Sequence, residues 1–145
     1  FWEPYHQPDA IYESGGAGLY STVGDYLKFS QMLANGGVYN GKRIIGRKTI
    51  DLMRANQLNA DQLKDFNNSY LTGYGYGLGV RTLMSTAEGN SNGSVGEFGW
   101  TGYLGTYTSI DPSEGFSIVY MHQMVPNMEE YHHLRVRAVA NGCLR

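Results

Sequence analysis

The residues most able to form a binding or catalytic surface lie in one stretch, Glu97–Thr106, with the sequence EFGWTGYLGT. Three aromatic residues, three glycines and two threonines stand within these ten positions. Glycine within a strand loses conformational entropy on folding and packs against nothing. Several glycines together therefore indicate a place where a ligand or another backbone comes close. A sheet with bulges and tight bends would have the same composition, so both interpretations are open at this point.

Length, charge and cysteine content exclude several classes of protein. The 145 residues suffice for one domain with a buried core. The net charge of -2 and the lack of a basic run argue against a nucleic-acid partner. No apolar run approaches the roughly 20 residues of a membrane span, and no signal peptide is visible, so the compartment stays open. The single cysteine, Cys143, excludes an internal disulfide and a cysteine-rich metal site.

Capping signals predict the first helix. Thr22 and Asp25 have the spacing of a capping box, and Gly36-Gly37 closes the pattern, which places the helix at about 22–35. The apolar residues at helical spacing within it are Tyr26, Phe29, Met32 and Leu33. Asp25 is better explained as a capping carboxylate than as a catalytic one.

The next segments combine a small hairpin with a second helix. Asn40-Gly41 is a preferred two-residue turn, so residues 38–45 are expected to form a hairpin. A second helix is expected at 47–55, with Ile50 and Met53 on one face. The polar segment 56–72 is expected to be a loop with a turn of helix.

From Gly73 onward the pattern changes to strands. Residues 74–80 alternate between apolar residues and glycines with a period of two, which predicts one strand. Further strands are expected at 94–100, 103–110 and 116–123. The turn composition of 111–115 makes the last two an antiparallel hairpin.

A final helix completes the expected fold. It starts at Pro126-Asn127 and ends near Asn141-Gly142. Its expected inner stripe is Met128, Tyr131, Leu134 and Ala138. Two helices, three or four antiparallel strands and one helix form an α+β domain in which helices pack on an antiparallel sheet.

Three segments in order resemble the superfamily of serine β-lactamases and penicillin-binding proteins, in particular class C-like β-lactamases and family VIII carboxylesterases. The first is Gly16–Thr22 with Asp25 after it, and the second is Tyr76–Val80. The third is Gly99-Trp100-Thr101-Gly102, followed by Gly105-Thr106 and Asp111-Pro112. The resemblance covers roughly residues 14 to 140, and a lone Trp-Thr-Gly would carry little weight.

The resemblance implies roles for four residues. The third active-site motif of the family is Lys-Thr-Gly in β-lactamases and often His-x-Gly or Trp-x-Gly in the esterases, and it forms one wall of the active-site cleft. Trp100, Thr101 and Gly102 would occupy that wall and bind substrate. The backbone N–H of Tyr103 would be one oxyanion-hole donor, with the small Gly102 beside it leaving room for substrate. The family implies no metal and no cofactor.

Two motifs of the family are missing from the sequence. No serine has a lysine three residues later, as the nucleophile motif Ser-x-x-Lys requires, and no tyrosine has an asparagine two residues later. Both motifs belong to the N-terminal part of such enzymes, and the chain also starts at Phe1 without an initiator methionine. Residues 1–145 are therefore expected to be one partial domain, the C-terminal half of a longer hydrolase. Alone it should be inactive, with the N-terminal half of the same protein as its partner.

Trp100 predicts the kind of substrate. The motif lysine of β-lactamases offers a fixed positive charge, whereas tryptophan offers apolar area and an uncharged N–H. An anionic β-lactam or peptide carboxylate would lose a charge-assisted contact of about 1.5–3 kcal/mol. Neutral esters or amides would lose nothing, so they are the expected substrates.

The remaining tyrosine, histidine and glutamate residues that could act in catalysis or metal binding are expected to have structural roles. Tyr103, Tyr107 and Tyr120 are expected to pack on the sheet face. His132-His133 are expected at the surface of the last helix without metal, and His122 is expected to be structural. Glu97 precedes the motif, but its strand parity argues against a place in the cleft.

The sequence is also compatible with a binding function and predicts self-association. Tyrosine-rich antiparallel sheets also build carbohydrate- or peptide-binding modules, and a family member without activity could act as a penicillin-recognising receptor. A hydrolase lacking its first half exposes a sheet edge and an apolar face, which favours self-association. Light scattering at micromolar concentration tests this, and a monomeric mass would contradict it.

Overall fold

The computed structural model of the protein describes residues 7–9, 11–16 and 18–145. The sequence from Phe1 to Glu13 is aromatic and proline-bearing without a period and predicts an irregular arm; residues 1–6 and 10 of it, and Ala17 of the first motif, lie outside the described residues. The helices are α1 (Val23–Ala34), α2 (Arg47–Met53), α3 (Ala60–Phe66) and α4 (Glu129–Asn141), with a 3₁₀ turn η2 (Ser69–Leu71). The strands are β1 (Val38–Tyr39), β2 (Lys42–Arg43), β3 (Tyr74–Tyr76), β4 (Arg81–Leu83), β5 (Phe98–Thr101), β6 (Tyr107–Asp111) and β7 (Phe116–Tyr120). None of the described helices is long and apolar enough to cross a membrane.

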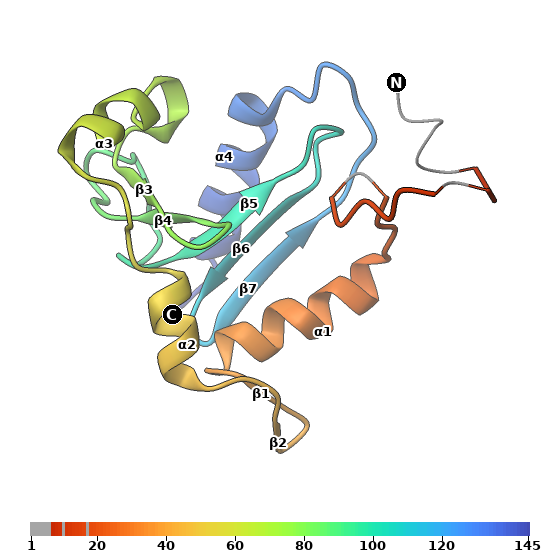
Figure 1. The fold of residues 1–145 in the computed structure, drawn as a ribbon. Helices are drawn as coiled ribbons and strands as arrows, with labels where there is room; N and C mark the ends of the chain where they lie inside the picture. The colour runs from red at the N-terminus through yellow and green to blue at the C-terminus, as the bar shows by residue number, and fades with distance from the viewer. Residues whose placement is uncertain (1–6, 10, 17) are drawn as a thin grey trace.

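The described chain has the expected α+β architecture. Strands β3 to β7 form one antiparallel sheet in sequence order, and β1 and β2 pair separately. The helices α1 and α4 lie on opposite faces of the large sheet (Figure 1). The order of elements differs from the prediction, since α3 and η2 also precede the sheet and the sheet has five strands.

Local signals form α1 as predicted. The Thr22 hydroxyl accepts a hydrogen bond from the Asp25 N–H at 3.1 Å, which caps the helix. Gly36 adopts φ 63, and Gly37 N donates to Met32 O at 2.8 Å, so the helix ends in a Schellman motif. Phe29 has the spacing of the inner residues but is 49% exposed. The residues that α1 buries are Ser30, Met32, Leu33 and Ala34.

The first hairpin and α2 are confirmed. Asn40 and Gly41 have φ values of 48 and 75, as both turn positions of a type I′ hairpin require. Ile50 of α2 is 2% exposed. It belongs to an apolar core between α1, α2 and one face of the sheet, made of Met32, Leu33, Ala34, Ile50, Phe98 and Ile110.

The polar segment 56–72 is more helical than predicted. A capping box starts α3, because Asn59 accepts from Gln62 N at 2.9 Å and the Gln62 side chain accepts from Asn59 N at 3.0 Å. The side chains of α3 are exposed or half-buried, so apolar periodicity could not reveal this helix.

The single strand predicted over 74–80 is wrong, because the chain turns within it. β3 ends at Tyr76, which pairs with Arg81 at the start of β4. Gly79 lies in the turn at φ 80. Glycine adopts a positive φ at little cost, so a residue that fitted the alternating pattern is the one that allows the strand to reverse.

Turns shorten the strands on both sides of the third motif. Glu97 N donates to Ser94 O at 2.9 Å, so β5 begins at Phe98 and not at residue 94. Tyr103 lies in the turn after β5, since β6 begins only at Tyr107. Tyr103 is 64% exposed, and its expected packing on the sheet face is wrong.

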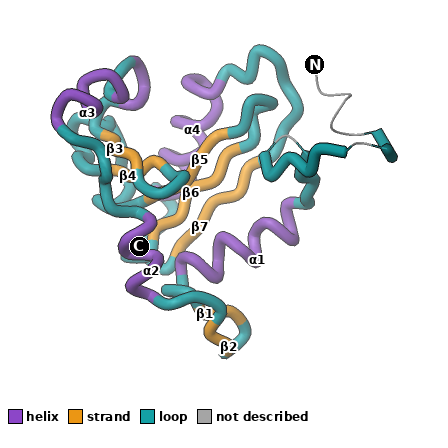
Figure 2. The backbone as a smooth tube through the Cα atoms, viewed as in Figure 1, coloured by secondary structure: helices purple, strands orange, loops and turns teal. Residues whose placement is uncertain are grey.

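The hairpin of β6 and β7 is confirmed, and its side chains alternate between two layers. Thr108 faces α1, where its hydroxyl lies 3.3 Å from the Ser30 hydroxyl. Tyr107 faces α4 and stacks on His133 with ring centroids 4.9 Å apart. The segments that follow β5 and β7 lie at the same end of the sheet (Figure 2).

The inner face of α4 is polar, and the predicted apolar stripe is wrong. The helix buries His133, Arg137 and Asn141, which follow one another at four-residue spacing. His133, expected at the surface, is 3% exposed. The physical reason is the sheet face opposite, whose buried residues are Tyr74, Arg81, Glu97, Tyr107, Ser109 and Asp111.

Candidate functional site

The four residues of the third motif stand where β5 ends and turns toward β6. Trp100 and Thr101 are the last two residues of β5, and Gly102 and Tyr103 begin the turn. Trp100 is 43% exposed and Tyr103 is 64% exposed, while Thr101 and Gly102 are half-buried. This end of the hairpin presents two aromatic side chains with a small backbone segment between them.

Trp100 extends an aromatic row outside the apolar core. Alternate residues of a strand share a face, yet Phe98 is 1% exposed while Trp100 stays largely open. The Trp100 ring meets Tyr76 edge-on at 5.4 Å, and Tyr76 meets Phe66 of α3 at 5.8 Å. The three rings together form a wall from α3 to the motif.

Thr101 contacts a phenol that α4 holds. Tyr70 of η2 donates to the Glu129 carboxylate at 2.5 Å. Thr101 lies near the same phenol, where its side chain weakly opposes the rise in the pKa of Tyr70. Burial, and then the hydrogen bond to Glu129, raises the pKa of Tyr70 to about 12. The phenol therefore stays protonated near neutral pH and links η2 to β5 and to the first turn of α4.

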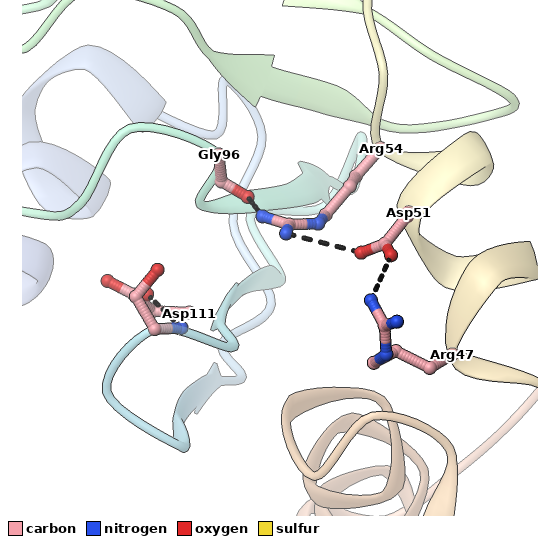
Figure 3. A network of polar contacts seen from close by, with 6 residues as sticks. Arg47, Asp51, Arg54, Gly96 and Asp111 are labelled. Atoms are coloured by element: carbon pink, nitrogen blue, oxygen red, sulfur yellow. Dashed lines mark hydrogen bonds and ion pairs between the residues drawn. The ribbon is translucent and has the colours of Figure 1, made fainter.

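Arg54, the residue after α2, holds the segment that leads into β5. Arg54 donates through Nη1 to Gly96 O at 2.9 Å and through Nη2 to Asp51 at 3.4 Å (Figure 3). Asp51 also accepts from Arg47 at 2.7 Å. Gly96 has φ 90, and a Cβ on it would overlap the Arg54 guanidinium. The chain thus enters β5 at a position set by contacts with α2.

Two glycines allow the turn after the motif. Gly102 N donates to Thr106 O at 2.7 Å, and Gly105 N donates to Gly102 O at 2.9 Å. A Cβ on Gly102 would overlap the Thr106 hydroxyl. Gly105 has φ 95, and a Cβ there would overlap His122 Nε2. Contacts within the protein therefore account for these two glycines.

The segment after β7 holds the same turn from outside. Met124 N donates to Leu104 O at 2.9 Å. The Asn127 side-chain amide donates to Gly102 O at 3.3 Å, and His133 Nε2 lies 2.8 Å from Gly105 O. Three carbonyl groups of one short turn thus accept hydrogen bonds from residues 124–133.

Three histidines gather behind the turn. His122 Nδ1 lies 2.9 Å from the Tyr120 hydroxyl, in keeping with the structural role expected of His122. The His122 ring centroid lies 5.1 Å from that of His132 and 6.3 Å from that of His133. Within the described part of the chain, no three His, Cys, Asp or Glu side chains are placed to hold a metal ion.

His133 is neutral and has a defined tautomer. A carbonyl oxygen only accepts, so the proton sits on Nε2, which donates to Gly105 O. Nδ1 is buried without a hydrogen-bond partner among the described residues. Burial lowers the pKa of His133, and the hydrogen bond to Gly105 opposes this less strongly. Protonating Nδ1 would bury an unpaired charge.

Sequence reasoning found the motif but missed the residues that support it. Glu97, weighed for the cleft, is instead buried and accepts from the Ser109 hydroxyl at 2.5 Å. The missed residues are Phe66, Tyr70, Asn127 and His133, and Tyr76 was found only as part of the second segment, without a role. The polar series Glu129, His133, Arg137 and Asn141 at four-residue spacing was a signal for the inner face of α4. No local signal marked Tyr70, whose partners are distant in sequence.

A family model and several relatives match most of this chain. A family model described as Beta-lactamase matches residues 2–141. Two Mycobacterium tuberculosis proteins, uncharacterized protein MT1414 and protein Rv1367c, are each 31% identical over 130 residues, which is 86% of this chain and 32% of theirs. A putative D-alanyl-D-alanine carboxypeptidase of Escherichia coli K12 is 30% identical over 125 residues, which is 81% of this chain and 26% of that protein. The chain thus spans about a third or less of these relatives.

A solved structure has the same fold. EstCE1, described as a hydrolase with promiscuous acyltransferase activity, superposes with a TM-score of 0.75 at 24% sequence identity. The superposition covers 94% of this chain and 33% of that one.

We expect Gly105→Ala to destabilise the protein more than its backbone angle alone explains. Gly115, in the turn after β6, also has a positive φ of 61 but open space around it, so Gly115→Ala measures the backbone cost. That cost is about 1–2 kcal/mol, and the overlap with His122 should add about 1–3 kcal/mol. Urea denaturation of both variants measures the difference. Equal destabilisation would show that the turn does not pack on His122.

The lowered pKa of His133 predicts a loss of stability in acid. The unfolded imidazole takes up a proton near pH 6.5, but the folded one does so only at lower pH. The contribution of neutral His133 to the free energy of unfolding is therefore fully present above pH 6.5, the pKa of the unfolded imidazole. It is lost as the pH falls toward the lower pKa of His133 in the folded protein.

His133→Gln isolates this contribution, because its amide can donate to Gly105 O and does not titrate. The charged and titratable groups around position 133 stay the same in both proteins: Arg81, Tyr107, Tyr120, His122, Glu129 and His132. The unfolding free energy of the wild type minus that of the variant should fall between about pH 7 and about pH 5. A constant difference would contradict the prediction.

Proposed function

The chain belongs to the beta-lactamase family, and we propose that it is the C-terminal part of a longer serine hydrolase that works through an acyl-enzyme. The observation that carries the proposal is the position of Trp100–Tyr103 at the open end of β5, where the exposed Trp100 continues a half-buried aromatic row. In this role Trp100, Thr101 and Gly102 line one wall of the cleft. The Tyr103 N–H is one donor of the oxyanion hole.

The turn suits an oxyanion-hole donor for a physical reason. Such a donor is effective when it is fixed before the reaction, so that no reorganisation is needed as the negative charge develops. The turn of Gly102–Thr106 is closed by two internal hydrogen bonds and held by the segment after β7. Gly102 keeps this turn closed beside the Tyr103 amide, because a Cβ at position 102 would overlap the Thr106 hydroxyl.

The nucleophile and its base lie outside this chain in our proposal. The 145 residues hold no Ser-x-x-Lys and no Tyr-x-Asn, so the chain alone does not catalyse acyl transfer. The N-terminal part of the same protein is its partner. Surface features support this partner: Val23, Leu27 and Phe29 of α1 are 48%, 39% and 49% exposed, and β7 is an edge strand in the described sheet. Without the partner the chain self-associates through such surfaces.

The proposed substrates are neutral esters or amides. Trp100 contributes no charge, and its ring continues the row of Tyr76 and Phe66. The name of the Escherichia coli relative indicates instead a peptide with a free C-terminal carboxylate, which a lysine in place of Trp100 would suit better. Family membership favours a hydrolase over a carbohydrate- or peptide-binding module, although the exposed Trp100 ring would also suit such a ligand.

The complete protein should hydrolyse short-chain nitrophenyl esters with higher kcat/KM than a cephalosporin or a D-alanyl-D-alanine peptide. Trp100→Lys should raise kcat/KM for the anionic substrates by about tenfold or more, because one charge-assisted contact contributes about 1.5–3 kcal/mol. Trp100→Met is the matched control, since it also removes the ring but adds no charge. The 145-residue chain alone should show no activity above buffer.

Three outcomes would overturn parts of this function. A cephalosporin hydrolysed faster than the esters would refute the substrate class. An equal gain in Trp100→Met and Trp100→Lys would refute the charge argument. A complete protein that is labelled by penicillin but turns over no substrate would be a penicillin-recognising receptor and not a hydrolase.

A further inference from the structure

We propose that Asn127 and His133 are positioning residues that set the direction of the Tyr103 N–H. The claim that these residues affect catalysis rests on the proposed function. The claim that they set the direction of the Tyr103 N–H rests only on the hydrogen bonds of the turn. Neither residue would touch the substrate. Both act through the backbone between β5 and β6.

One peptide group joins Gly102 to Tyr103. The carbonyl of Gly102 and the N–H of Tyr103 belong to one rigid, planar unit and point in opposite directions. Whatever fixes the direction of Gly102 O therefore also fixes the direction of the Tyr103 N–H. Gly102 O accepts from Gly105 N at 2.9 Å within the turn and from Asn127 Nδ2 at 3.3 Å from outside it.

The Asn127 amide is itself held in one orientation. Its Oδ1 accepts from the N–H of Glu129, the first residue of α4, at 3.2 Å. With the oxygen turned to that N–H, the amide nitrogen is left to donate to Gly102 O. Asn127 thus connects the N-terminus of α4 to the peptide group that carries the Tyr103 N–H.

His133 fixes the other end of the same turn. Its Nε2–H donates to Gly105 O at 2.8 Å, while its ring stacks on Tyr107 at 4.9 Å with an interplanar angle of 16°. The ring is 3% exposed, so solvent does not compete for this hydrogen bond. Because Gly105 N in turn donates to Gly102 O, a shift of Gly105 would reach the same carbonyl that Asn127 binds.

Asn127→Asp tests the first contact with little change in shape. The carboxylate can still accept from Glu129 N, but it cannot donate to Gly102 O and places a negative charge beside it. Asn92→Asp is the matched control, because the Asn92 amide also donates to a backbone carbonyl, Ala138 O at 2.9 Å, but far from the turn. Both variants lose one amide donor and gain one charge.

The first readout does not depend on activity. In the complete protein labelled with ¹⁵N-tyrosine, Asn127→Asp should shift the backbone amide signal of Tyr103 and accelerate its hydrogen exchange. Asn92→Asp should leave this signal in place. An unchanged Tyr103 signal in Asn127→Asp would overturn the inference, whether or not the protein proves to be a hydrolase.

The second readout is the kinetics of the complete protein on a nitrophenyl ester. Loss of a whole oxyanion-hole donor lowers kcat about 10²–10³-fold, so a misdirected donor in Asn127→Asp should lower kcat about tenfold or more. KM should change less than kcat, because the contact gains strength only in the transition state. Counting active sites with a fluorophosphonate corrects each rate for any misfolded protein.

His133 supplies an independent pair of variants. His133→Leu removes the donor and should lower kcat, whereas His133→Gln keeps a donor and should restore most of it. If His133 only stabilised the fold, both variants would have fewer active sites but an unchanged kcat per active site. If Asn127→Asp and His133→Leu both keep the kcat per active site of the wild type, the claim that these residues support catalysis is overturned. A wild type without ester turnover or fluorophosphonate labelling would instead refute the proposed function.

Discussion

The burial of charged side chains between α4 and the sheet is the constraint on which the rest of the structure depends. Arg81, Glu97 and Arg137 are 7%, 4% and 3% exposed, and a buried charge is costly unless partners surround it. Arg137 hydrogen-bonds the Tyr74 hydroxyl, and the Arg81 guanidinium lies over the Tyr74 ring at 5.4 Å. Arg137 also donates to Gly89 O and Asn90 O, so its contacts fix the register of α4 against β3 and the segment after β4. Burial also raises the pKa of Glu97, which the hydrogen bond from Ser109 opposes.

That register has consequences for the motif. It places His133 under Gly105, and it places the segment before α4 where Asn127 reaches Gly102 O. On the other face of the sheet, Phe98 belongs to the apolar core that α1 and α2 cover. Trp100, two residues further along β5, stays open. The motif thus lies at the boundary between a packed interior and an uncovered surface, fixed by a polar layer behind it.

The sequence predicted best those elements whose signals are local. The cap at Thr22, the glycines after α1 and the turn at 111–115 depend on neighbouring residues, and the structure contains them as expected. The prediction of which α4 residues are buried failed, because it depends on the sheet face that packs against this helix. The inner face of α4 cannot be derived from its own residues, because His133 is buried only where Tyr107 and Gly105 lie against it. The residues of the motif were found through family resemblance, whereas the contacts that hold its turn join positions more than twenty residues apart.

The central claim is that this chain supplies one wall and one oxyanion-hole amide of a serine hydrolase site. A crystal structure of the complete protein after reaction with a fluorophosphonate tests it most directly. We predict a phosphonylated serine outside the present 145 residues, with its phosphonyl oxygen about 2.7–3.1 Å from Tyr103 N. Trp100 should lie against the alkyl group of the adduct. An adduct whose oxygen points away from Tyr103, or a protein that forms no adduct, would contradict the account.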